Sequence, residues 1–107
     1  MVKKRILLVD DYKPWRNGVK EVLEEAGFDV TAFSALAAAK AADIRLFDGF
    51  VVDGSIEVTD DGVEWAQELV RKGHRVVVCS SGYVPPGLPQ VEKINFSAEK
   101  IRRVLGI

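Results

Sequence analysis

Three aspartates follow two apolar segments whose carboxyl ends would meet if the segments are neighbouring strands. Asp10 and Asp11 come directly after Ile6–Val9, and Asp53 comes directly after Phe50–Val52. Such short apolar runs are typical of strands buried on both faces of a parallel sheet, whose functional crevice lies beyond the carboxyl ends of the strands. Carboxylates gathered at one rim repel one another unless a cation lies between them, and carboxylate oxygens with water suit Mg²⁺. The pattern therefore predicts a magnesium site.

Two hydroxyl groups and one ammonium group are expected at the same rim. Ser80 and Ser81 follow the apolar run Val76–Cys79, and Lys93 lies in or near the last expected strand. A hydroxyl and an ammonium facing this rim suit a phosphoryl group, so the residues favour a Mg²⁺-dependent phosphoryl site with one aspartate as acceptor. Each feature alone has an ordinary explanation, because such residues are also common in turns and at solvated sheet edges. The prediction rests on their combination at matching strand ends.

The segments between these residues alternate between strand-like and helix-like patterns. The apolar residues of Trp15–Ala26 fall on one helical face, between Pro14, which suits a helix start, and Gly27, which suits a helix end. Three later residues can cap further helices: Ser34, Asp61 and Ser97. The expected strands are Ile6–Val9, Phe28–Phe33, Phe50–Val52, Val76–Cys79 and Val91–Phe96. This order, βαβαβαβ followed by a loop and βα, predicts an open α/β sandwich with helices on both faces of a parallel sheet.

The composition excludes several classes of protein. The 107 residues are 48% hydrophobic and 29% charged, which fits one globular domain over residues 1–107. A formal net charge of -1 shows no surplus that would indicate direct nucleic-acid binding. One cysteine and one histidine cannot form an internal disulfide or a thiolate–imidazole zinc site. No apolar run could span a bilayer and the first is too short for a signal peptide, so we expect a cytoplasmic protein without membrane insertion.

Three stretches of the chain resemble the receiver domain of bacterial two-component response regulators. They are Lys4–Trp15 (KRILLVDDYKPW), Leu46–Ile56 (LFDGFVVDGSI) and Arg75–Tyr83 (RVVVCSSGY), and the similarity runs nearly end to end. The resemblance implies a single-domain receiver with a doubly wound, flavodoxin-like sheet of five parallel strands in the order 2-1-3-4-5.

The resemblance also assigns the acceptor and the metal ligands. Asp53 would be the phosphoacceptor, taking a phosphoryl group from the phosphohistidine of a histidine kinase or phosphotransfer protein. Mg²⁺ would be bound directly by Asp11, largely through water by Asp10, and by Asp53 and the backbone carbonyl of Ser55.

The hydroxyl and ammonium positions follow from the same resemblance. Ser81 best matches the hydroxyl that contacts the phosphoryl group, with Ser80 as the alternative, depending on where the fourth strand ends. Lys93 is the candidate for the lysine that contacts a phosphoryl oxygen. Receivers usually carry proline after that lysine, whereas Ile94 follows here, and an alignment on Ile94–Phe96 would put Glu92 at the lysine position. In a strand, such a one-residue shift turns a side chain to the other face.

A second departure from the family pattern lies between Ser81 and Lys93. Pro85, Pro86 and Pro89 fall in this short stretch, and they exclude a regular helix there. The fourth helix of a receiver is therefore predicted to be missing or reduced to a turn. The aromatic switch residue of receivers, commonly two positions before the lysine, corresponds to Val91.

Three functions remain open from the sequence. The first is a receiver that accepts phosphate on Asp53 and signals through contacts with an unknown downstream protein, without catalytic turnover beyond its own phosphorylation and dephosphorylation. The second is a degenerate pseudo-receiver, a protein-binding module independent of phosphorylation. The third, a small hydrolase or transferase, would need a segment to cover its substrate, and the 107 residues leave no room for one.

Overall fold

The strands form one parallel sheet in a computed structural model that describes residues 3–54, 61–80 and 84–107. In chain order they are β1 (Arg5–Val9), β2 (Asp29–Phe33), β3 (Gly49–Asp53), β4 (Val76–Ser80) and β5 (Gln90–Glu92). Their spatial order is β2-β1-β3-β4-β5, with every pairing parallel. The predicted order 2-1-3-4-5 is confirmed. It places the carboxyl ends of β1 and β3 next to each other.

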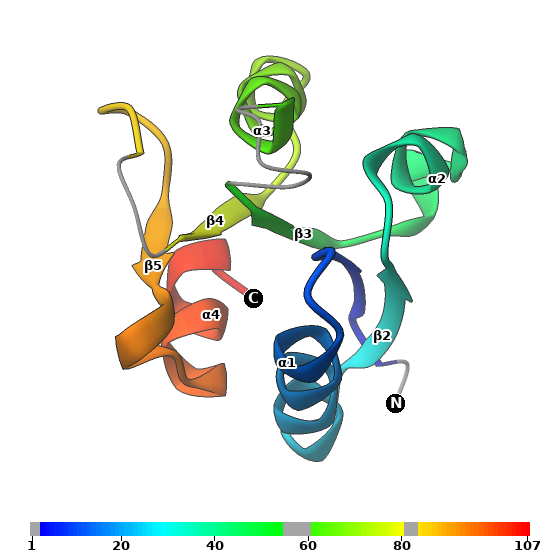
Figure 1. Cartoon of the computed structure of the whole chain (residues 1–107), viewed down its shortest axis with the longest axis vertical. Helices are drawn as coiled ribbons and strands as arrows, with labels where there is room; N and C mark the ends of the chain where they lie inside the picture. The colour runs from blue at the N-terminus through cyan, green and yellow to red at the C-terminus, as the bar shows by residue number, and fades with distance from the viewer. Residues whose placement is uncertain (1–2, 55–60, 81–83) are drawn as a thin grey trace.

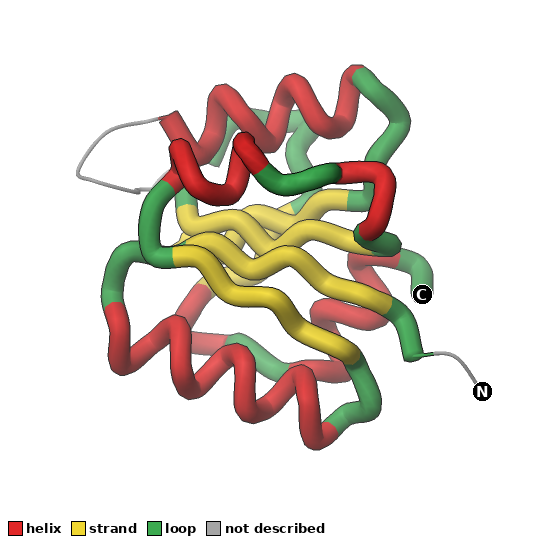
Figure 2. The backbone as a smooth tube through the Cα atoms, turned by 90° about the vertical axis from the view of Figure 1, so that its right-hand side faces the viewer, coloured by secondary structure: helices red, strands yellow, loops and turns green. Residues whose placement is uncertain are grey.

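Four α-helices in the described part of the chain cover the two faces of the sheet. They are α1 (Lys13–Glu25), α2 (Leu36–Ala41), α3 (Asp61–Arg71) and α4 (Ala98–Leu105). Figure 1 shows α2 and α3 on one face and α1 and α4 on the other, and Figure 2 shows the sheet between these two layers. No helix among these residues combines the length and the apolar character that crossing a bilayer requires.

Two apolar cores hold the strands in place, one on each face of the sheet. Leu7 and Val9 point into the core beneath α2 and α3, whereas Ile6 and Leu8 point into the core beneath α1 and α4. All four side chains are fully buried, and each burial of this kind contributes about 1.5–3 kcal/mol. Because both faces are covered, the strand sequence is continuously apolar, and the polar residues that follow are fixed at the rim.

The helix ends agree with two predictions and contradict a third. Ser97 is the N-cap of α4, where its Oγ accepts a hydrogen bond from the backbone N–H of Lys100 at 3.2 Å. Gly27 follows α1 with a φ of +98°, a left-handed conformation that favours glycine. The prediction that Ser34 caps the second helix is wrong, because the N-cap is Ala35, which has no capping side chain. The short α2 is held by burial of Leu36 and Ala39 instead.

The connection from β4 to β5 contains no helix over its described residues, 84–89. Val84 and Leu88 bury their side chains in the core beneath α2 and α3, so an irregular loop covers this part of the sheet. This agrees with the predicted loss or reduction of the fourth helix. Residues 81–83 lie outside the described part.

The last strand is shorter than predicted. The sequence predicts a strand over Val91–Phe96, but β5 ends at Glu92 and a 3₁₀ turn, η3 (Lys93–Asn95), follows directly. The apolar residues Ile94 and Phe96 suggest strand alternation, yet Ile94 is 88% exposed and Phe96 lies after the turn. This correction decides where the side chain of Lys93 goes.

Candidate functional site

Three carboxylates meet at the carboxyl end of the sheet, as the sequence predicts. Asp10 follows β1, Asp53 is the last residue of β3, and β1 pairs with β3 up to Val9 opposite Val52. Ligand oxygens of Asp10, Asp11 and Asp53 all lie within 4.8 Å of one another. Asp10 and Asp53 are buried, at 1% and 4% exposure, and Asp11 is exposed.

Asp10 is held by hydrogen bonds to its own loop and to β2. Its Oδ1 accepts from the backbone N–H of Tyr12 at 2.9 Å, and its own N–H donates to the carbonyl of Phe33 at 3.1 Å. The Arg16 guanidinium donates to the Asp10 carbonyl at 2.9 Å. Burial raises the pKa of the Asp10 carboxyl and nearby Asp53 raises it further, against the lowering effect of the Tyr12 N–H and of Lys93. The charged form of Asp10 is therefore disfavoured, and a further cation beside it would stabilise that form.

The Lys93 ammonium lies between two of these carboxylates. Its Nζ is 3.4 Å from Asp10 Oδ2 and 3.4 Å from Asp53 Oδ1, and its side chain is only 22% exposed. The alternative alignment that puts Glu92 in this place is wrong, because Glu92 is an exposed strand residue and Lys93 reaches the carboxylates. Strand alternation does not govern Lys93, since β5 ends before it and η3 turns the backbone.

Trp15 is a site neighbour whose role the sequence does not reveal. Its helical spacing predicts a packing residue of α1, and it does pack partly against the core beneath α1 and α4. Its ring also lies under the Lys93 ammonium, 5.6 Å from Nζ to the ring centroid, and makes an edge contact with Phe96. The sequence signal for this role is slight: Trp15 lies about one helical turn beyond the acidic pair.

Two glycines let α3 and β4 approach the acceptor strand closely. A Cβ at Gly62, in the first turn of α3, would overlap the carbonyl oxygen of Asp53. A Cβ at Gly54 would lie 3.2 Å from a methyl group of Val78 and 3.4 Å from the Ser80 hydroxyl oxygen. The sequence marks Gly54 only as a turn residue and gives Gly62 no role, because close backbone approach leaves no mark in a single sequence.

Of the two candidate hydroxyls, the structure describes Ser80. It is the last residue of β4 and is 5% exposed, beside Gly54. Ser81, the better match to the family pattern, lies outside the described residues. So does Ser55, whose carbonyl is predicted to bind the metal.

The neighbouring Cys79 is not a candidate nucleophile. It pairs with Asp53 across β3 and β4, but its side chain points into the core beneath α1 and α4. Burial raises the pKa of the Cys79 thiol to about 12, so the thiol stays protonated near neutral pH.

The donor set fits a hard divalent cation. It consists of carboxylate oxygens, which Mg²⁺ and Ca²⁺ prefer, with an exposed member that leaves the site open to water. Oxygens on opposite sides of one such ion lie about 4–5 Å apart, and the three aspartates offer atoms within 4.8 Å. Asp10, Asp11 and Asp53 could therefore bind one ion together.

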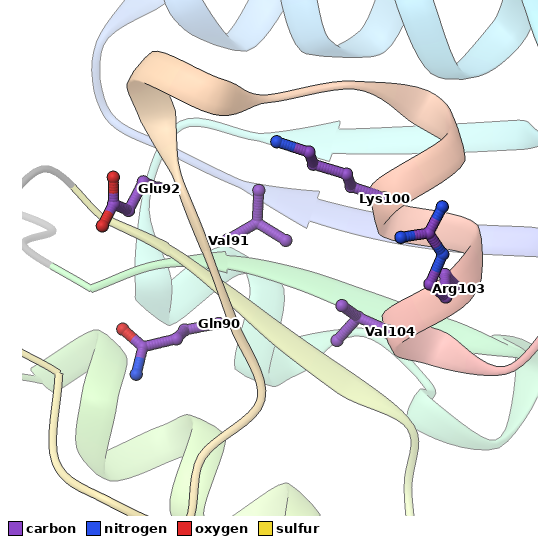
Figure 3. Close-up of a pocket in the computed structure, with 6 residues that line it drawn as sticks. All are labelled: Gln90, Val91, Glu92, Lys100, Arg103 and Val104. Atoms are coloured by element: carbon purple, nitrogen blue, oxygen red, sulfur yellow. The ribbon is translucent and has the colours of Figure 1, made fainter.

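A separate groove of about 300 Å³ lies at the outer edge of the sheet. Figure 3 shows it between β5 and α4, with Val91 on the side towards α4 and with Gln90 and Glu92 projecting the other way. Asp10, Asp53 and Lys93 are not among its lining residues, so the groove is distinct from the carboxylate site.

Comparison with known proteins finds similar solved structures but no matching family model or curated protein. A response regulator receiver protein from Pseudoalteromonas atlantica is similar, with a TM-score of 0.79 and 19% identity over 95% of this chain and 97% of that one. A CheY-like receiver domain protein from Methanospirillum hungatei JF-1 has a TM-score of 0.79 and 22% identity over 98% and 95% of the two chains.

A third similar structure contains a modified aspartate and a divalent cation. It is a response regulator from Burkholderia pseudomallei with a phosphorylated aspartic acid, a calcium ion and citrate. Its TM-score is 0.73 and its identity 21%, over 96% of this chain and 66% of that one. The chain therefore has the fold of CheY-like receiver domains, with three carboxylates and a lysine at the carboxyl end of its sheet.

Proposed function

We propose that the chain is a single receiver domain of a two-component phosphorelay and accepts a phosphoryl group on Asp53. One observation carries the proposal: the Lys93 ammonium lies 3.4 Å from both Asp10 and Asp53 at the carboxyl end of a receiver-type sheet. The three carboxylates supply an acceptor and a metal site, and the ammonium supplies a positive charge beside the acceptor. This combination suits the transfer of a dianionic phosphoryl group.

In the transfer step, an Asp53 carboxylate oxygen attacks the phosphorus of a phosphohistidine on the partner kinase or phosphotransfer protein. The new O–P bond forms as the P–N bond breaks, and the bonding electron pair returns to the imidazole nitrogen. Lys93, already beside Asp53 Oδ1, contacts an oxygen of the transferred group and balances its charge. Gly62 allows α3 to approach the Asp53 backbone and so fixes the acceptor strand against the helix.

The metal site would be formed by Asp10, Asp11 and Asp53 with the backbone carbonyl of Ser55. When bound there, Mg²⁺ neutralises negative charge on the phosphoryl oxygens. The hydrogen bond from the Tyr12 N–H orients Asp10 for this role, and Asp11, which is exposed, would hold the ion from the solvent side. The calcium ion in the Burkholderia pseudomallei relative supports a divalent cation in proteins of this fold.

The phosphoryl group also needs a hydroxyl donor at the end of β4. Ser81 is the match to the family pattern, and Ser80 is supported by its burial beside Gly54. Either serine would donate to a phosphoryl oxygen once Asp53 is modified.

The proposed activity is signalling rather than catalytic turnover. Phosphorylated Asp53 would change the contacts of the domain with a downstream protein in the cytoplasm, with no direct contact to nucleic acid. Its own chemistry would be limited to phosphoryl acceptance and the slow hydrolysis of the aspartyl phosphate.

The test is phosphorylation of the purified protein in the presence of Mg²⁺. Incubation with acetyl phosphate should add one phosphoryl group by intact-mass analysis, and beryllofluoride should change the fluorescence of Trp15. Asp53→Asn, which keeps the size of the side chain, should show neither effect. If the folded wild type and folded Asp53→Asn behave identically, Asp53 is not the phosphoacceptor.

A pseudo-receiver is the second candidate because the relay side of the domain is reduced. Residues 84–89 form a loop instead of a helix, and the position usually occupied by an aromatic switch holds Val91, which is buried in the core beneath α1 and α4. If the chain is a pseudo-receiver, the wild type and the Asp53→Asn variant should both fold and should bind the partner equally well. A switching receiver would instead bind differently after phosphorylation.

A further inference from the structure

The Lys93 ammonium has an aromatic neighbour in addition to its two carboxylates. Nζ lies 5.6 Å from the centroid of the Trp15 ring, within the distance at which a cation is attracted to an indole face. The Lys93 side chain is only 22% exposed, and such partial removal from water strengthens this attraction. Trp15 thus stands next to the group proposed to contact the phosphoryl oxygens.

The backbone that carries Lys93 gives its side chain little anchoring. The stem is four flexible carbons long, and it leaves the backbone from the first residue of a 3₁₀ turn at the end of a three-residue strand. The next residue, Ile94, is 88% exposed and cannot anchor the turn by packing. The carboxylates attract Lys93, but they are also the groups that a metal and a phosphoryl group would engage.

Trp15 itself is fixed from two sides. Its ring makes an edge-to-face contact with Phe96, at 5.5 Å between centroids and 72° between planes, and it packs against the core beneath α1 and α4. The next residue, Arg16, ties the first turn of α1 to the Asp10 carbonyl. Phe96 directly follows η3, so the residue that supports the indole is adjacent to the turn that carries Lys93.

We infer that Trp15 is a positioning residue that holds the Lys93 ammonium at the carboxylate site through its ring face. For its effect on phosphoryl transfer this inference rests on the proposed function, whereas the placement of Lys93 can be tested without it. An aromatic ring at position 15 is the requirement, so Trp15→Phe keeps the positioning in part and Trp15→Leu removes it.

The first experiment measures how accessible Lys93 is in the metal-free protein. The rate of its acetylation by an N-hydroxysuccinimide ester is followed by peptide mass spectrometry, with exposed Lys72 as internal reference. Trp15→Leu should raise the relative rate at Lys93 about three- to tenfold, and Trp15→Phe should raise it less. Trp65→Leu is the matched control, because it removes the tryptophan of the opposite core and should leave Lys93 unchanged.

An unchanged rate at Lys93 in folded Trp15→Leu would overturn the inference, as would an equal rise in Trp65→Leu. If Trp15→Leu does not fold, the emission of Trp15 is compared in Trp65→Phe with and without Lys93→Met. A shift of the emission on removal of the ammonium supports the contact, and no shift overturns it.

The second experiment separates positioning from general damage by a double-mutant cycle. The rate of Asp53 phosphorylation by acetyl phosphate is measured for Trp15→Leu, Lys93→Met and the double variant. Trp15→Leu should slow the reaction about three- to tenfold in the wild type and have no further effect in the Lys93→Met background. Full additivity would show that Trp15 acts independently of Lys93. If the wild type is not phosphorylated at all, the proposed function is wrong, but the inference about Trp15 is not affected. That inference is tested separately by the acetylation rate of Lys93.

Discussion

The charged carboxylate of Asp10 is unfavourable in the metal-free protein, because the residue is buried. Burial holds the pKa of its carboxyl above the ordinary value of 3.8. Between 3.8 and the raised value the folded state binds more protons than the unfolded state, so the free energy of unfolding falls as pH rises through that window. The charged form therefore costs stability at neutral pH.

We expect Asp10→Asn to raise the free energy of unfolding at pH 7 in the absence of metal. The amide oxygen of the new side chain can still accept from the Tyr12 N–H, and Lys93 keeps Asp53 as its partner. The gain should vanish as the pH falls below the ordinary carboxyl range, because Asp10 is then protonated in both states. Urea unfolding at the two pH values measures this, and a variant less stable at pH 7 would contradict it.

Ser80, the last residue of β4, and Ser81, which follows it, allow a second test at the same scale. We expect Ser80→Ala to slow Asp53 phosphorylation about tenfold or more, because Ser80 is buried at the strand end beside Gly54. Ser81→Ala is the variant for comparison, because it makes the same chemical change at the position that best matches the family pattern. A larger loss in Ser81→Ala would instead assign the hydroxyl to Ser81. Phosphorylation rates with acetyl phosphate give the answer directly.

The site residues differ in how far the sequence could predict them. Asp10, Asp11 and Asp53 were predictable because residues at the ends of parallel strands share one rim. Lys93 was a candidate, but Glu92 stayed open as the alternative, because a strand and a 3₁₀ turn aim the Lys93 side chain differently and the apolar pattern around Ile94 fits both. The role of Trp15 was hidden, since a ring that packs on a core and also faces a cation has the same helical spacing as one that only packs.

At the scale of elements, the contact of α3 with β3 depends on the missing side chain of Gly62. A Cβ there would overlap the Asp53 carbonyl oxygen, so Gly62→Ala must push α3 away from the acceptor strand. Alanine is normally the better helix former, by about 1 kcal/mol, yet we expect the substitution to destabilise the protein by about 1–3 kcal/mol.

The control for Gly62→Ala is Gly18→Ala. Gly18 lies in α1 with open space around its added Cβ, so alanine should stabilise the protein there by about 1 kcal/mol. Thermal unfolding of the two variants should therefore move in opposite directions. If Gly62→Ala is phosphorylated more slowly and Gly18→Ala at the normal rate, phosphorylation of Asp53 depends on the close approach of α3 to β3.

The order of elements was predictable, and their ends were less so. The alternation of apolar runs and amphipathic segments predicted β1 to β4 and the four helices, because burial on both faces leaves a strong pattern. The end of β5 was missed, since nothing local distinguishes a strand that stops at Glu92 from one that continues. The cap of α2 was missed because tertiary packing of Leu36 replaces the capping side chain.

For the whole molecule, the carboxylate site predicts that divalent metal and stability are linked. Mg²⁺ that binds only the folded state raises the free energy of unfolding by RT ln(1 + [Mg²⁺]/Kd), about 2.7 kcal/mol at a hundredfold excess over Kd. We expect titration with MgCl₂ to raise the melting temperature progressively. Asp11→Asn should abolish the effect, and KCl at equal ionic strength should not reproduce it. Equal stabilisation by both salts would exclude a specific site.

The three-residue length of β5 also bears on how molecules of this protein behave in concentrated solution. A strand at the border of a sheet offers unpaired backbone groups to which other chains can add, and a short, charged border limits this. β5 is a border strand with only one buried residue, Val91, and η3 bends the chain away immediately after Glu92. The early end of this strand therefore delivers Lys93 to the carboxylates and also leaves little backbone at this border of the sheet to which another chain could add.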